Sequence, residues 1–263
     1  MKRLIENIKS IYKYRFLLEQ LVSNNIRLKY RRSILGYIWS VLNPLLIMLI
    51  LTLVFSTIFN QNIDNFPVYL LTGRLCFDFL SEATKMGMNS IIGNASLLKK
   101  TYVPKFIFPI ASTTSSFINF IFALGALVIV MVVTRCIPSW HILLFIFVII
   151  ELYVFILGLS LFLAQFNTRF RDTQYIYNAF LTAWMYLTPI FYPAELLNET
   201  LLLRILSRLN PMYSYVQQAR DVILRHQLPG NGIVIAGILS SIVMLAVGLL
   251  SFYKNQDKFI FNI

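Results

Sequence analysis

The sequence predicts an all-α integral membrane protein with six transmembrane helices, an N-terminal amphipathic interface helix and re-entrant helices before the last span. Two observations support this prediction. Of the 263 residues, 58% are hydrophobic and 13% are charged, which is more apolar surface than the core of a soluble domain needs. No charged residue occurs between positions 38 and 59, and about 20 apolar residues suffice to cross the hydrocarbon core of a bilayer.

The segment before residue 37 is basic and amphipathic. Nine Lys and Arg residues precede Gly36, against Glu6 and Glu19. Apolar side chains recur at helical spacing, as is typical of a helix lying in a membrane interface. We therefore divide the chain into a cytoplasmic interface segment, 1–36, and a transmembrane domain, 37–263. The helix serves either as a membrane anchor or as a platform for a soluble partner. Its candidate residues are Leu18, Leu21, Arg27, Lys29, Arg31 and Arg32.

Six apolar runs define the predicted spans. They cover residues 38–59, 67–86, 106–134, 141–166, 174–192 and 232–253. An even number places both termini on one side, and the segments on that side then hold 17 of the 23 Lys and Arg residues. The positive-inside rule identifies this side as the cytoplasm. We expect no cleavable signal peptide, because the first apolar run begins too late and is too long.

The stretch between the fifth and sixth spans, 193–231, is long but not plainly polar. It is rich in Leu and is bordered or broken by Pro189, Pro193 and Pro211. This pattern predicts short re-entrant or interfacial helices that dip back into the membrane.

The net charge of +12 would suggest a nucleic-acid partner in a soluble protein. Here the basic residues lie at the ends of the predicted spans, where anionic lipid headgroups attract them. We therefore expect membrane lipids and no nucleic acid as partners. Cys76 and Cys136 match no metal-binding spacing, and each is predicted to be a buried, inert thiol.

The loop between the second and third spans, 87–105, contains a candidate docking surface. A short helix is predicted over 96–102, because a proline disfavours helical geometry in the residue before it. Two leucines and a tyrosine would form an apolar ridge flanked by two lysines, which fits a helix-in-groove contact with a partner. Alternatively, the lysines only hold the loop in the cytoplasm. The candidate residues are Leu97, Leu98, Lys99, Lys100, Tyr102 and Pro104.

Apart from Lys85, at the cytoplasmic end of the second span, four charged residues fall inside the predicted spans. Arg74, Asp78 and Glu82 recur every four residues and therefore share one helix face, while Glu151 lies near the middle of the fourth span. Such groups are costly in hydrocarbon and normally face a cavity or one another. A structural ion pair is the favoured interpretation, and a proton relay is the alternative.

Aromatic residues gather around the fifth span. The candidates for lining a conduit are Trp184, Tyr186, Phe191 and Tyr192. Flat rings with polar edges can bury the C–H faces of sugars while their hydroxyl groups form hydrogen bonds. Ordinary aromatic core packing explains the cluster almost as well.

Motifs for nucleotide binding and hydrolysis are absent from the sequence. It has no G-x-x-x-x-G-K-[ST] phosphate loop, no H-E-x-x-H or G-x-S-x-G motif and no Cys/His cluster. We therefore expect no enzyme activity, cofactor or metal in this chain.

Several short motifs carry a family resemblance. They are Arg27-Leu-Lys-Tyr-Arg-Arg-Ser-Ile-Leu-Gly36 with Trp39 and Pro44, Leu97-Leu-Lys-Lys-Thr-Tyr-Val-Pro104 with Pro109, Phe170-Arg171-Asp172 with Tyr175, Pro189-Ile190, Tyr192-Pro193, and Asn210-Pro211 with Arg220. Together they resemble the ABC-2 type permeases that export O-antigen, teichoic acid or capsule polysaccharide. The charged row at Arg74 is not part of that resemblance.

The resemblance implies a homodimeric channel in a bacterial plasma membrane, with two separate ATP-binding subunits beneath it. ATP and Mg²⁺ would be bound in those subunits, and the substrate would be a lipid-linked glycan. The loop at 97–104 would be the coupling helix, and 193–210 would supply the re-entrant helices. The basic rim of Arg27, Lys29, Arg31 and Arg32 would attract the lipid pyrophosphate, unless it only attracts anionic lipid in general.

The sequence leaves three rival functions open. One is an ABC-2 exporter of a small drug or lipid. Another is a proton-coupled secondary transporter that uses Glu151 or the Asp78/Glu82 pair. A membrane enzyme acting on polyprenyl lipids would need a polar catalytic cluster, which the sequence does not contain.

Overall fold

The computed structural model describes residues 12–31, 33–59, 63–194, 205, 209–256 and 259, with the side chains of 56–59 excepted. All regular structure in these residues is helical. The helices are α2 (Arg15–Tyr30), α3 (Trp39–Phe59), α4 (Phe66–Gly93), α5 (Ala95–Lys100), α6 (Ile107–Val133), α7 (Phe145–Arg169), α8 (Thr173–Leu187), α10 (Pro211–Ile223) and α11 (Asn231–Asn255), with 3₁₀ turns at Gly36–Ile38 and Trp140–Leu144.

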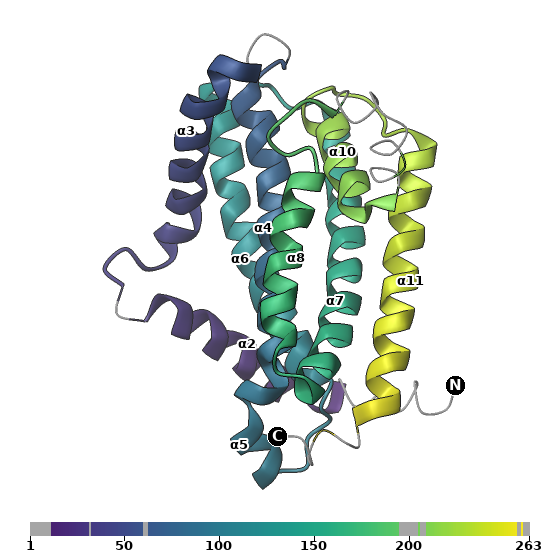
Figure 1. Cartoon of the computed structure of the whole chain (residues 1–263). Coiled ribbons are helices and arrows are strands. Elements are labelled where there is room, and N and C mark those ends of the chain that lie inside the picture. The colour runs from purple at the N-terminus through teal and green to yellow at the C-terminus, as the bar shows by residue number, and fades with distance from the viewer. Residues whose placement is uncertain are drawn as a thin grey trace.

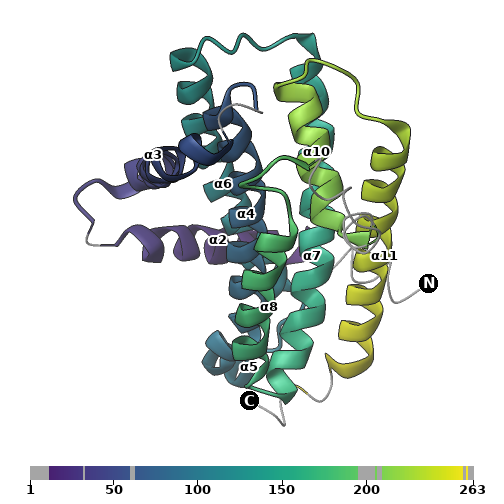
Figure 2. The ribbon, with the colours of Figure 1, turned by 45° about the horizontal axis from the view of Figure 1, so that its top comes forward.

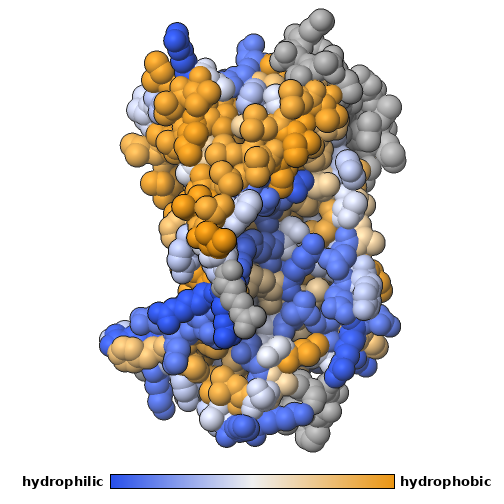
Figure 3. Space-filling model, turned by 90° about the vertical axis from the view of Figure 1, so that its left-hand side faces the viewer, coloured by the Kyte–Doolittle hydropathy of each residue, from blue (hydrophilic) through white to orange (hydrophobic). Residues whose placement is uncertain are grey.

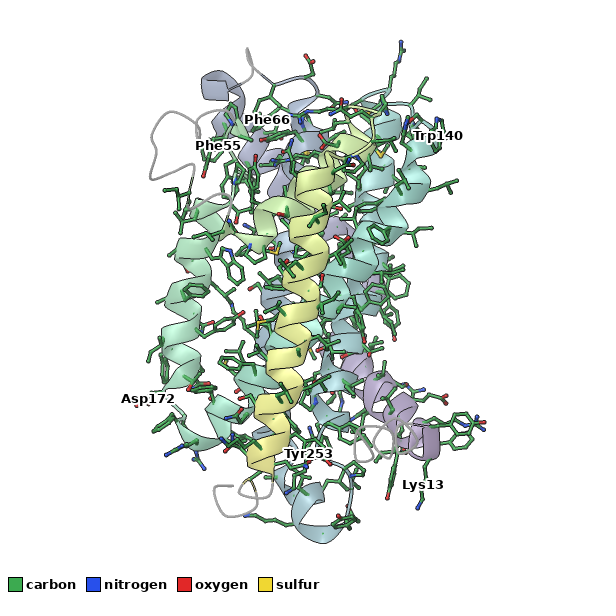
Figure 4. The ribbon with its side chains drawn as sticks, turned by 90° about the vertical axis from the view of Figure 1, so that its right-hand side faces the viewer. Lys13, Phe55, Phe66, Trp140, Asp172 and Tyr253 are labelled. Carbon is green, nitrogen blue, oxygen red and sulfur yellow. The ribbon has the colours of Figure 1, made fainter. Side chains whose placement is uncertain are left out.

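The long helices form an upright bundle (Figure 1). α4 packs along α6 and α7, and α11 packs along the opposite side of α7. α3 stands off from the body at one edge, and α2 crosses below it (Figures 1 and 2). Figure 4 shows Lys13, Asp172 and Tyr253 at one end of the bundle, and Phe66 and Trp140 at the other. We call these the α5 end and the α10 end.

Among the described residues, four helices are long and apolar enough to cross a membrane. They are Gly36–Phe55, Ile107–Val133, Trp140–Arg169 and Asn231–Asn255. α8 has 15 residues, so it rises only about 22 Å, less than the hydrocarbon thickness. α4 has 28 residues but carries charges and lies mostly buried within the bundle. The chain is a multi-pass membrane protein, and the full count of six spans stays a prediction.

The helix that contains the second predicted span is longer than the span itself. The predicted span ends at 86, but α4 continues to Gly93, and α5 follows after Asn94 alone. Gly87 does not break the helix, because it lies against α7, where an added Cβ would come 2.6 Å from Cβ of Ser160. α5 spans Ala95–Lys100 rather than the predicted 96–102.

A tight turn joins α2 to α3. Gly36 begins the 3₁₀ segment with φ of +50°, a left-handed conformation that glycine adopts without steric cost. This turn lets the basic helix lie across the bundle while the first apolar helix runs along it (Figure 1).

Two apolar clusters form the core. The larger cluster fills the bundle between α4, α6, α7, α8 and α10. The smaller lies at the α5 end and joins Leu98 of α5 to Ile107 of α6, Leu161 of α7 and Phe252 of α11. Cys76 is buried as predicted, but Cys136 is only half-buried; neither forms a disulfide.

Candidate functional site

A polar groove runs between α3 and the body of the bundle. It encloses about 580 Å³, and its walls come from α2, α3, α4 and α6. Figure 3 shows hydrophilic side chains gathered in this hollow, below and beside the apolar surface of the upper bundle. The polar side chains that matter here are Lys29, Asn43, Arg74, Asp78, Glu82 and Asn119. Polar groups at membrane depth normally face such a water-accessible cavity.

The charged row predicted on one helix face lines this groove. Nε of Arg74 lies 2.9 Å from the carboxylate of Asp78, one turn along α4. The guanidinium of Arg74 also reaches Sδ of Met185 on α8, at 3.2 Å. The predicted ion pair within the row is therefore confirmed for these two residues.

Glu82, the third member of the row, pairs outside α4. Nζ of Lys29 on α2 donates to both of its carboxylate oxygens at 2.8 Å. Nδ2 of Asn119 on α6 donates to Oε1 of Glu82 at 2.9 Å, and the hydroxyl of Tyr30 lies 3.5 Å from Oδ1 of Asn119. This network ties α2, α4 and α6 together. The sequence could not reveal it, because its partners lie 53 and 37 residues apart.

The loop around α5 presents a different surface from the one predicted. Leu98 is buried in the smaller core cluster, and Leu97 packs against it. The apolar ridge therefore faces inward, since these leucines hold α5 to its own chain. Lys99, Lys100 and Tyr102 are exposed, and the Tyr102 side chain is 96% exposed. Pro104 is half-buried and lies three residues before the first residue of α6.

The candidate residues of α2 divide between two faces. Leu18 and Leu21 pack against the smaller core cluster, whereas Arg27 and Arg31 are exposed. Arg32 lies outside the described residues, as do most of the predicted re-entrant residues, 195–204 and 206–208. α2 is thus bound to the bundle on one side and exposes basic side chains on the other.

The four aromatic candidates fall into two groups, two that are buried and two that are exposed or half-buried. Trp184 is buried, and its Nε1 donates to Oδ1 of Asn210 at 2.6 Å. Phe191 is buried against Phe55, with ring centroids 5.8 Å apart. Their position agrees with core packing rather than with a conduit wall. Tyr186 is 61% exposed, and the half-buried Tyr192 donates from its hydroxyl to the carbonyl of Tyr186.

Glu151 lies away from the groove. It is buried on α7, where Nε2 of Gln218 on α10 donates to its carboxylate at 3.1 Å. No cation pairs with it among the residues that the structure describes. Within the described part of the chain, the polar partner of Glu151 is therefore an amide.

Arg220 has a structural role that sequence reasoning missed. It is buried on α10, and its guanidinium donates to the carbonyls of Pro189, Ile190 and Tyr69 at 2.6–3.4 Å. It also lies 3.4 Å from the ring centroid of Tyr69. The residue therefore joins α4, α10 and the turn after α8. Its neighbours Gln217, Gln218 and Asp221 are polar, so the local sequence held no signal that Arg220 is buried.

Asp221 lies next to it near the α10 end. Burial raises the pKa of its carboxyl, and Arg225 opposes the shift through an ion pair of 2.9 Å. Among the described residues, no group of three His, Cys, Asp or Glu side chains gathers to hold a metal. The hydrogen bonds of Arg220 and the ion pair of Asp221 with Arg225 therefore hold α10 in place.

Comparison with known proteins decides the family. The model of the ABC-2 type transporter family matches residues 17–224. The chain belongs to the ABC-2 type transporter family. This permease is 31% identical over 256 residues to the O-antigen export system permease protein RfbA of Myxococcus xanthus, covering 97% of the chain and 98% of that relative. It is 28% identical over 260 residues to the RfbA protein of Klebsiella pneumoniae, covering 96% and 98%.

Proposed function

We propose that this permease is the membrane subunit of an ATP-driven exporter that moves a lipid-linked polysaccharide of the O-antigen type across a bacterial plasma membrane. The similarity to O-antigen export permeases, which extends over 97% of the chain, carries the proposal. Teichoic acid and capsule polysaccharide are the alternative glycans. Export of a small drug or lipid has no comparable support.

A homodimer is the proposed working unit. The polar groove opens beside α3, which has few buried side chains. A groove left open to lipid would expose charged groups to hydrocarbon, which is costly. A second copy that packs on the α3 and α8 side would enclose the groove within a channel.

The α5 end is proposed to face the cytoplasm, with both termini on that side. Its exposed residues include Lys99, Lys100 and the basic side chains of α2, as the positive-inside rule requires. Two ATP-binding subunits would dock there and hold the ATP and Mg²⁺. Because only Asn94 separates α4 from α5, a force applied to α5 would act directly on the helix that lines the groove.

Co-purification tests this function. The tagged permease is expressed with its candidate ATP-binding subunit, purified from membranes, and assayed for bound subunit and for ATP hydrolysis. We expect both in the wild type, and we expect Tyr102→Asp with Lys99→Glu to remove most of the bound subunit. These side chains are exposed, so the fold should tolerate the changes.

The control is Arg135→Glu at the α10 end, an exposed position with the same charge reversal. It should leave the bound subunit unchanged. Loss of the subunit in both variants, or in neither, would contradict α5 docking. A permease that transports in vesicles with a pH gradient and no ATPase would contradict the ABC mechanism altogether.

A further inference from the structure

The Lys29–Glu82 ion pair stands where two hollows meet. The polar groove lies on one side of it. On the other is a hollow of about 480 Å³ lined by Asn25, Leu28, Lys29, Glu82 and Met86. Both hollows are lined by Lys29 and Glu82. The pair therefore closes the junction between the space under α2 and the groove along α3 and α4.

The two halves of the pair are held differently. Glu82 has a second anchor, since Nδ2 of Asn119 donates to its Oε1 at 2.9 Å. The hydrogen bonds of the Lys29 ammonium go to the Glu82 carboxylate. A lysine has a flexible four-carbon stem. Lys29 can therefore leave Glu82 while the carboxylate stays oriented by α6.

The pair is also accessible to an incoming anion. The side chains of Lys29 and Glu82 are 40% and 34% exposed. Ion pairs with this much solvent contact contribute little net stability. A diphosphate carries at least two negative charges against the single charge of a carboxylate, and its oxygens form strong charge-assisted hydrogen bonds. Exchange of Glu82 for a phosphate group at Lys29 is thus a small energetic step.

The surrounding charges favour an anion once the exchange has occurred. Lys85 lines the same groove, one turn beyond Glu82 on α4, and Arg31 is exposed just after α2. Arg74 is neutralised by Asp78. Lys29, Lys85 and Arg31 therefore outnumber Glu82, and the local charge balance is positive.

We propose that Lys29 binds a phosphate-class anion, and that Glu82 is the resident counter-ion that occupies Lys29 until the anion displaces it. This assignment rests on the proposed function for its natural ligand, the diphosphate that links a glycan to its lipid. Of the described residues of the basic rim, Arg27, Lys29 and Arg31, it selects Lys29, because this side chain lines the groove. Displacement would open the junction between the two hollows.

Direct binding tests the proposal without the ATPase. The full chain is placed in phosphatidylcholine nanodiscs, and binding of geranylgeranyl diphosphate is measured for the wild type and for Glu82→Gln, Lys29→Gln and the double variant. Removing the competing carboxylate should tighten binding by about threefold or more. Lys29→Gln should weaken it by a similar factor, and the double variant should bind as Lys29→Gln does.

The matched control is Arg27→Gln, an exposed cation of the same helix that does not line the groove. It should bind like the wild type. Equal losses in Arg27→Gln and Lys29→Gln would overturn the proposal in favour of general surface attraction. A gain in Glu82→Gln that persists without Lys29 would overturn it too. Should Glu82→Gln fail to fold, the comparison of Lys29→Gln with Arg27→Gln decides alone.

Two further probes identify the source of the phosphate. Geranylgeraniol, which lacks the diphosphate, should not respond to Lys29→Gln; an equal response would overturn anion recognition. Inorganic pyrophosphate that binds as tightly as the lipid would support the phosphate site and assign it to a soluble anion. Failure of these tests with intact ATPase co-purification would remove the Lys29 assignment and leave the proposed function standing.

Discussion

Arg220 is the residue whose removal should cost the most. Replacing it with Met removes the buried guanidinium that donates to the carbonyls of Pro189, Ile190 and Tyr69, and among the described residues Pro189 then keeps only the 3.4 Å contact with the hydroxyl of Tyr69. Each unsatisfied buried acceptor costs about 1–3 kcal/mol, so we expect the free energy of unfolding to fall by about 3 kcal/mol or more. Thermal unfolding in detergent measures this as a lowered Tm.

Two variants sharpen the prediction for Arg220. Arg220→Lys should recover only part of the loss, because an ammonium lacks the planar fork that serves several carbonyls at once. Arg171→Met is the control: it removes an exposed arginine at the α5 end and should change stability by at most about 0.5 kcal/mol. A Tm for Arg220→Met equal to that of Arg171→Met would contradict this structural role of Arg220.

Residue spacing predicted part of the candidate site. Local periodicity along α4 was enough to place Arg74, Asp78 and Glu82 on one face, and the structure pairs the first two. It was not enough to find Lys29, because the packing of α2 across α4 and α6 is tertiary. The same limit applies to Leu98, whose apolar character fits an exposed ridge and a buried core position equally well.

Close helix contact between α7 and α11 gives a prediction at the scale of elements. A Cβ added to Gly248 would lie 2.1 Å from the carbonyl oxygen of Gly158, and one added to Gly158 would lie 2.5 Å from the backbone of Met244 and Leu245. Backbone atoms cannot move aside as a flexible side chain can. We expect Gly158→Ala or Gly248→Ala to destabilise the protein by about 1–3 kcal/mol.

Gly125 provides the matched control for this helix contact. It lies in α6, and its added Cβ would come no nearer than 3.6 Å to Cγ2 of Val41. Alanine there should be neutral or stabilise the helix by up to about 1 kcal/mol. The measurement is again thermal unfolding in detergent. Equal Tm values for Gly248→Ala and Gly125→Ala would show that the two helices do not approach so closely.

Helix existence was easier to predict from the sequence than helix ends. Apolar length alone identified α3, α6, α7 and α11, because hydrocarbon thickness sets a minimum run. α4 overran its predicted end at 86 by seven residues, since its polar C-terminal turns are buried by contacts such as Gly87 with Ser160. α8 stopped at Leu187, five residues before the predicted end at 192.

The two sides of the whole molecule differ in polarity. Figure 1 shows α3 at one edge of the bundle and α11 at the opposite edge. The outer face of α11 is apolar, with exposed Ile235, Leu239 and Ile242, and lipid can cover it at no cost. The α3 edge borders a groove with charged walls. We therefore expect the proposed second copy to pack on the polar side.

Disulfide cross-linking tests this assignment. In a background with Cys76→Ala and Cys136→Ala, single cysteines are placed at the exposed α8 positions Ile176, Phe180 and Tyr186. Mild oxidation of membranes should then produce dimers from at least one of them, because a two-fold axis beside α3 and α8 brings equivalent positions together. Ile242→Cys on α11 is equally exposed and should stay monomeric on a non-reducing gel. Dimers formed only through α11 would place the groove against lipid, and its charged walls would then need another explanation.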